Sequence, residues 1–79
     1  TALGNSYYLL NRYKEAKKVY KKILTIKKDP LILNNLALTY IHLNECEKAK
    51  KSIKKAIELD QKNRDFYEKS YMEIINYCR

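Results

Sequence analysis

The chain has 79 residues, which is enough for one small domain or part of one, because domains usually run to about 100–150 residues. It contains one Gly and one Pro, against roughly nine of the two at average usage, so most all-β folds, glycine-rich phosphate loops and the dinucleotide-binding fingerprint are excluded. Lys and Arg number 17 against nine Asp and Glu, a net charge of +8, which attracts anionic partners without indicating a fold.

Apolar residues recur along the chain at the three- and four-residue spacing of helices that bury one face. We predict five helices joined by short loops, at residues 2–10, 14–27, 31–43, 47–59 and 64–77. Asp29 and Pro30 mark the start of the third, since Asp accepts the free N–H groups of a first turn and Pro lacks only a donor that is unused there. Asn63 is the corresponding cap of the last helix. The residues expected on buried faces from the second helix onward are Ala16, Tyr20, Ile23, Leu24, Leu33, Leu36, Ala37, Tyr40, Ile41, Ala49, Ile53, Ala56, Ile57, Tyr67, Tyr71, Ile74 and Cys78.

The sequence repeats with a period of 33 residues. Residues 3–30 align with residues 36–63, and nine of the 28 pairs are identical. The apolar identities fall at helical spacings, so each unit is predicted to be a pair of helices. Because one pair cannot cover its own apolar face, neighbouring pairs are expected to stack.

This pattern resembles the tetratricopeptide repeat, which carries Leu-Gly and Tyr on its first helix and Ala, an aromatic residue and Ala on its second. The matching residues are Leu3, Gly4, Tyr7, Ala16 and Tyr20 in the first unit and Leu36, Ala37, Tyr40, Ala49, Ile53 and Ala56 in the second. A third unit restarts at Tyr67 but has Ser70 and Tyr71 in place of Leu-Gly. The resemblance implies an all-α, right-handed solenoid of antiparallel helix pairs. One domain would span residues 1–79, with repeats at 1–29 and 30–62 and a capping helix or partial third repeat at 63–79.

Small residues are expected where two helix backbones approach closely, because a large side chain would push the helices apart. These residues are Gly4, Ala16, Ala37, Ala49 and Ala56. Two and a half units are close to the minimum of about three that such arrays need. We therefore expect either that the native protein is longer or that two copies cover each other's ends.

The resemblance further implies a protein–protein interaction scaffold and no enzyme, with a peptide or helical segment bound in the concave groove lined by the first helix of each unit. By position, the groove residues are Asn5, Tyr8, Leu9, Asn34, Asn35, Leu38, Ile41, Asp65, Glu68, Lys69, Met72 and Ile75. Their apolar character suits an amphipathic helix or an apolar peptide. The alternative is a structural module whose groove is filled by a second copy or by further repeats.

A sharper template within the family is the carboxylate clamp, which holds the acidic C-terminus of heat-shock chaperones with two Asn and three basic residues. Asn5, Asn35 and Lys69 match three of its five positions. Thr1 and Asp65 stand where Lys is required, and Asp65 would repel a carboxylate. The sequence therefore favours a groove for an apolar or helical segment over the clamp.

Lysines concentrate on the second helix of each unit, which forms the convex back in this family. A candidate anion ridge consists of Lys17, Lys18, Lys21, Lys22, Lys50, Lys51, Lys54 and Lys55. The alternative interpretation is a solvated helix face. Nucleic-acid binding ranks below peptide binding, because Arg, which makes bidentate phosphate contacts, is scarce.

The remaining polar residues indicate no catalytic or metal site and no cofactor. Cys46 and Cys78 lie 32 residues apart with one His in the chain, a spacing that fits no zinc motif. Nothing local suggests that they pair, so Cys46 is interpreted as a small buried thiol, and the cytoplasm or another reducing compartment is expected. His42 is interpreted as a surface or groove residue. No apolar run approaches the roughly 20 residues of a membrane span.

Overall fold

Residues 12–78 are described by the structure, a computed structural model. They form four α-helices and a short 3₁₀ turn, namely α2 (Tyr13–Ile26), α3 (Pro30–His42), α4 (Cys46–Leu59), the turn Gln61–Asn63 and α5 (Arg64–Tyr77). Each helix begins and ends within one residue of its predicted bounds, which confirms the all-α prediction for this part of the chain. The helix predicted at residues 2–10 lies outside the described residues.

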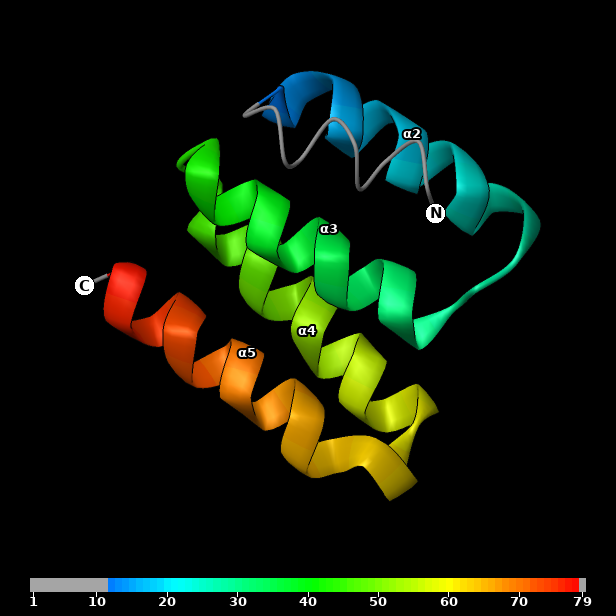
Figure 1. Ribbon diagram of the computed structural model, residues 1–79, viewed down its shortest axis with the longest axis vertical. Helices are drawn as coiled ribbons and strands as arrows, with labels where there is room; N and C mark the ends of the chain where they lie inside the picture. The colour runs from blue at the N-terminus through cyan, green and yellow to red at the C-terminus, as the bar shows by residue number, and fades with distance from the viewer. Residues whose placement is uncertain (1–11, 79) are drawn as a thin grey trace.

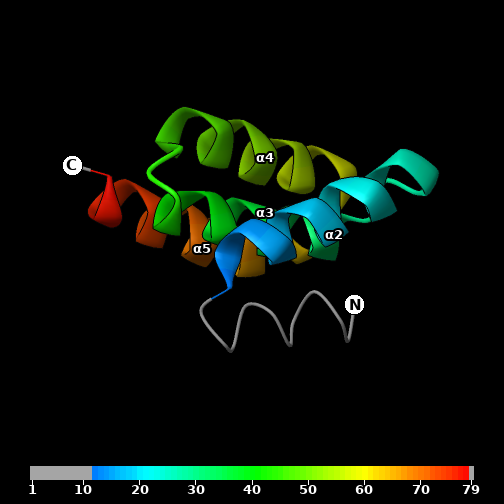
Figure 2. The ribbon, with the colours of Figure 1, turned by 90° about the horizontal axis from the view of Figure 1, so that it is seen from above.

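Helices that follow one another in the chain run antiparallel (Figure 1). α2, α3 and α5 lie side by side in one layer, and Figure 2 shows α4 on one side of that layer. α3 contacts each of the other three helices, and α5 also contacts α4. The described residues therefore form the stacked helix pairs that the repeat predicts.

α3 is the most deeply buried of these helices. Eight of its 13 residues are buried, whereas α2 buries two of 14 and α4 buries four of 14. The expected buried faces are confirmed throughout the described residues, with Ile23, Leu24, Ile57, Tyr71 and Cys78 partly buried against a core formed by the others. Burial of apolar surface on several sides of α3 is what holds the other helices to it.

Small residues allow these helices to pack closely. Ala16, Ala37, Ala49 and Ala56 are all fully buried, as expected for positions where backbones approach each other. The hydroxyl of Ser52 on α4 donates a buried hydrogen bond of 2.8 Å to the backbone carbonyl of Leu33 on α3. Gly4, the fifth residue of this predicted set, lies outside the described residues.

The ends of α3 are fixed by local backbone chemistry. The amide of Leu31 donates to the Asp29 carboxylate at 2.9 Å, which confirms the cap predicted from Asp29 and Pro30. After α3, Asn44 adopts a positive φ of 61°, a conformation that Asn tolerates better than most residues. The amide of Glu45 then donates to the carbonyl of Tyr40 at 2.9 Å. This turn reverses the chain and directs α4 back along α3.

Asn63 occupies the predicted cap position of α5, but the predicted side-chain capping bond is wrong. Asn63 precedes α5, but its side chain makes no capping bond and donates instead to the Asp60 carboxylate at 3.0 Å. The hydroxyl of Tyr67 donates to the same carboxylate at 2.9 Å. These hydrogen bonds, from Asn63 first and then Tyr67, lower the pKa of Asp60. Burial, reinforced by the bond to Asp60, raises the pKa of Tyr67 to about 12.

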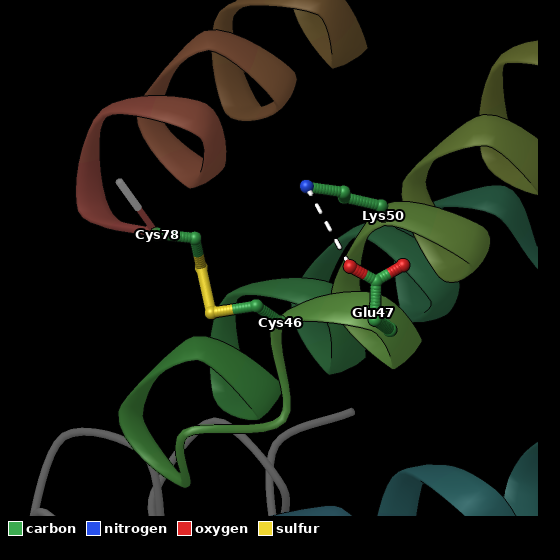
Figure 3. The surroundings of a disulfide bond; sticks show 4 residues. All are labelled: Cys46, Glu47, Lys50 and Cys78. Carbon is green, nitrogen blue, oxygen red and sulfur yellow. Dashed lines mark ion pairs between the residues drawn. A yellow bond between two sulfur atoms is a disulfide. The ribbon is translucent and has the colours of Figure 1, made fainter.

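A disulfide joins Cys46, at the start of α4, to Cys78, which follows α5 (Figure 3). Their Cα atoms are 6.0 Å apart, within the range that a disulfide spans. Because α5 runs antiparallel to α4, the end of α5 returns to the point where α4 begins. The bond therefore ties the end of the last helix to the start of the preceding one.

The disulfide corrects the interpretation of Cys46 as an unpaired buried thiol. Cys46 is half-buried and bonded to Cys78. The partners are distant in sequence, and only the antiparallel stacking of α4 and α5 places them together. The reducing compartment inferred from unpaired cysteines stays a prediction. As for membranes, none of the helices within residues 12–78 has the length and apolar character needed to cross one.

Ionisation of Tyr67 should destabilise the protein at alkaline pH. Its pKa is raised from 10.0 to about 12 in the folded state, so its contribution to stability is present below about pH 10 and is lost as the pH rises towards 12. We expect the melting temperature of the wild type to fall more steeply across this interval than that of Tyr67→Phe, measured by circular dichroism. All other groups are common to the two proteins and cancel in the difference, so equal slopes would contradict this assignment.

Breaking the Cys46–Cys78 bond should lower the free energy of unfolding. The bond closes a loop with a sequence separation of 32 residues, for which loop-closure entropy gives about 3–4 kcal/mol. Urea denaturation with and without a thiol-free reductant measures this loss. The Cys46→Ser/Cys78→Ser variant is the control. Its free energy of unfolding should equal that of the reduced wild type and should not change when the reductant is added. Two titratable thiols in the folded, unreduced protein would show the bond to be absent.

Candidate functional site

The predicted peptide groove is only partly open in the structure. Asn5, Tyr8 and Leu9 lie outside the described residues. Asn34 and Ile41 are buried, with 4% and 1% of their surface exposed, so an incoming segment cannot reach them. The remaining predicted residues are accessible, with Asn35, Leu38, Glu68 and Ile75 half-buried and Asp65, Lys69 and Met72 exposed.

The accessible residues of α3 lie along one face of the helix. Leu31, Asn35, Leu38 and His42 follow one another at spacings of four, three and four residues, which places them in one row. Asn34 and Ile41 lie outside this row, nearer the face packed against the core. Leu31 is 53% exposed and was missed by the sequence analysis, although it stands one helical turn before Asn35.

His42, at one end of this row, contacts two aromatic rings. The His42 ring stacks on Tyr13 of α2 with a centroid separation of 4.4 Å and meets the edge of Tyr77 of α5 at 5.5 Å. His42 is half-buried and so connects three helices. His42 therefore has a structural role in addition to the surface or groove position that the sequence predicts.

On α5, Asp65, Lys69 and Met72 continue at the same helical spacing. α3 and α5 contact each other and lie side by side (Figures 1 and 2). Met72 is 59% exposed. The accessible part of the predicted groove thus combines Leu38, Met72 and Ile75 with Asn35, the carboxylates of Asp65 and Glu68, and Lys69, for which no ion pair occurs within residues 12–78.

Two of the eight lysines in the predicted ridge are engaged within the protein. Lys17 is half-buried, forms an ion pair with Glu45 at 3.0 Å and lies 5.6 Å from the centre of the Tyr40 ring. Lys50 pairs with Glu47 at 3.8 Å (Figure 3). The hydrogen bond from Lys17, assisted by Lys48, lowers the pKa of Glu45. The other six side chains are exposed and form no ion pair with a described residue, namely Lys18, Lys21, Lys22, Lys51, Lys54 and Lys55.

An open groove of about 520 Å³ runs between α3 and α4. We call it the lysine-walled groove. Its floor is apolar, from Leu33, Leu36 and Tyr40 of α3, and its wall carries Lys48, Lys51, Ser52, Lys54, Lys55 and Glu58 of α4. The sequence predicted the floor residues as core and the lysines as a convex ridge, but it carried no signal that the two sets border one hollow.

Within residues 12–78, no group of three His, Cys, Asp or Glu side chains is placed to hold a metal ion. The accessible residues form two kinds of surface, a row on α3 and α5 that includes exposed apolar side chains and a basic groove between α3 and α4. Both surfaces extend along helices.

Comparison with known proteins identifies the family. Two models of the tetratricopeptide repeat match the chain, one over residues 1–29 and the other over residues 31–63. No curated protein and no solved structure matches it. The antiparallel pair α3 and α4 fills the second match, and α2 ends the first. The chain therefore belongs to the tetratricopeptide repeat family.

Proposed function

We propose that this chain is an interaction scaffold that binds a peptide or helical segment of a partner along the first helices of its repeats. Tetratricopeptide repeats generally mediate protein–protein interaction and are generally not enzymes. In the described part of the chain the first helices are α3 and α5. The observation that carries the proposal is the solvent exposure of large apolar side chains on both, Leu31 at 53% and Met72 at 59%.

The chemistry of this row favours a partner that is partly apolar. Leu38 lies between Leu31 and His42 in the row on α3, and Met72 offers a flexible thioether on the neighbouring helix. Asn35 and Lys69 supply hydrogen-bond donors beside them. An amphipathic helix would bury its apolar residues here and keep its polar face in water.

Substitutions on the row should weaken binding, while an equally exposed residue elsewhere should not. Peptides selected from a random library against the wild-type chain provide the probes, and calorimetry provides their affinities. We expect Leu31→Glu and Met72→Glu each to weaken binding by about tenfold or more, because a carboxylate would be buried without a partner. Leu59→Glu is the matched control, since Leu59 is 49% exposed but lies on α4, a second helix.

Two outcomes would contradict the proposal. Selected peptides that keep their affinity for both row variants would bind elsewhere. A Leu59→Glu variant that loses as much affinity as Met72→Glu would show that exposed apolar surface in general, and not this row, captures peptides. Sedimentation of the same proteins tests the alternative: a wild-type dimer that Met72→Glu converts to a monomer would mean that a second copy fills the row.

A further inference from the structure

The lysine-walled groove is a basic surface with an apolar floor, and it lies on a different side of α3 from the proposed peptide row. Leu36 and Leu38, one from each surface, are two residues apart, which corresponds to about 200° of rotation around a helix. The wall comes from α4, whereas the peptide row lies on α3 and α5. A ligand of this groove would therefore be bound separately from a segment on the peptide row.

The positive charge of the wall is neutralised only in part within residues 12–78. Lys48 pairs with Glu45 at 3.4 Å, but Lys51, Lys54 and Lys55 form no ion pair with any described residue. Glu58 lines the groove one turn after Lys54 and Lys55, but it forms no ion pair with a described residue. Lys51 and Lys55 are like charges one turn apart, an arrangement that costs a few tenths of a kcal/mol, roughly 0.2–0.5, and that an anionic ligand would relieve.

The basic surface continues beyond the groove towards α2. A second hollow of about 290 Å³ is lined by Lys14, Lys17 and Lys18 together with Leu43 and Glu45. The two hollows are neighbours, since Lys17 and Glu45 of the second contact Tyr40 and Lys48 of the first. The result is a strip of lysines with apolar residues at its base, following α3 between α2 and α4.

We propose that this strip binds a short acidic segment of a partner protein that carries apolar side chains among its carboxylates. The exposed ammonium groups would meet the carboxylates, and apolar side chains would pack along the methylene stems of the wall lysines, above the buried Leu33, Leu36 and Tyr40. Lys48 and Lys55 are seven residues apart on α4, or about 10 Å along the helix axis. A helical segment of three turns, about 16 Å, is therefore longer than the wall.

The side chains present favour a peptide over a nucleic acid. The hollows are lined by Lys and contain no Arg, whereas planar bidentate contacts to phosphate require Arg. Bases of single strands stack on exposed aromatic faces, but Tyr40, the aromatic residue of the floor, is 94% buried by its neighbours, with 6% exposed. An apolar floor also gives no advantage to a ligand that presents phosphates alone.

Fluorescence anisotropy with three labelled probes tests the proposal on the intact chain. The probes are a peptide of about 12 residues with Glu or Asp and Leu at helical spacing, the same peptide with Ser for Leu, and a single-stranded oligonucleotide of equal charge. We expect the acidic Leu peptide to bind, and its affinity to fall as salt screens the lysines. It should bind about tenfold more tightly than the Ser peptide. The oligonucleotide should bind more weakly than the Leu peptide.

Charge reversal locates the site without disturbing the core. The Lys51→Glu/Lys55→Glu variant should bind the Leu peptide more weakly, by about tenfold or more. Lys21→Glu/Lys22→Glu is the control, since these exposed lysines change the net charge equally but line neither hollow. Circular dichroism verifies that both variants fold. Equal losses in the two variants, equal binding of the Leu and Ser peptides, or tighter binding of the oligonucleotide would each overturn the proposal. Leu31→Glu and Met72→Glu should leave this binding unchanged, which separates it from the peptide row.

Discussion

Burial of α3 is the constraint on which the rest of the structure depends. Eight of its 13 residues are buried, and it contacts α2, α4 and α5. Within residues 12–78, α2 and α4 pack on α3, and α5 packs on both α3 and α4. The fully buried alanines Ala37, Ala49 and Ala56 allow the close approach. The short turn at Asn44 and the cap at Asp29 then fix where α3 ends and begins.

The same helix supports both candidate binding surfaces. On one side, Leu31, Asn35 and Leu38 form part of the proposed peptide row. On nearly the opposite side, Leu33, Leu36 and Tyr40 form the floor of the lysine-walled groove. A helix buried against its neighbours holds the residues of both rows in fixed positions, which reduces the entropy lost when a partner binds. The neighbouring helices contribute the other residues of the two surfaces. Met72 comes from α5 and the wall lysines come from α4.

Much of the fold was predictable because it follows from local periodicity. The 33-residue repeat and the three- and four-residue spacing of apolar side chains located α2 to α5 within one residue. The Asp29 cap was predictable because it depends on two adjacent residues. The accessibility of the site residues was less predictable. Asn34 and Ile41 have the same sequence character as Asn35 and Leu38, and only the packing around α3 buries the first pair and leaves the second reachable.

The features that the sequence did not reveal join residues far apart in the chain. Cys46 and Cys78 meet because α5 returns along α4. Asn63 donates to Asp60 in place of capping α5, because Asp60 also accepts from the buried Tyr67 and is fixed beside both. The lysine-walled groove requires the relative placement of α3 and α4. Neither composition nor periodicity encodes these placements directly.

Hydrogen exchange of the folded protein tests the central role of α3 most directly. If burial of α3 holds the other helices in place, its amides at residues 36–41 should exchange only through global unfolding, with the highest protection in the chain. The amides of α2 and α5, which bury fewer residues, should open at lower free energy. Exchange of α3 amides as fast as those of α5 would contradict the account, because the outer helices would then be stable without the helix on which they pack.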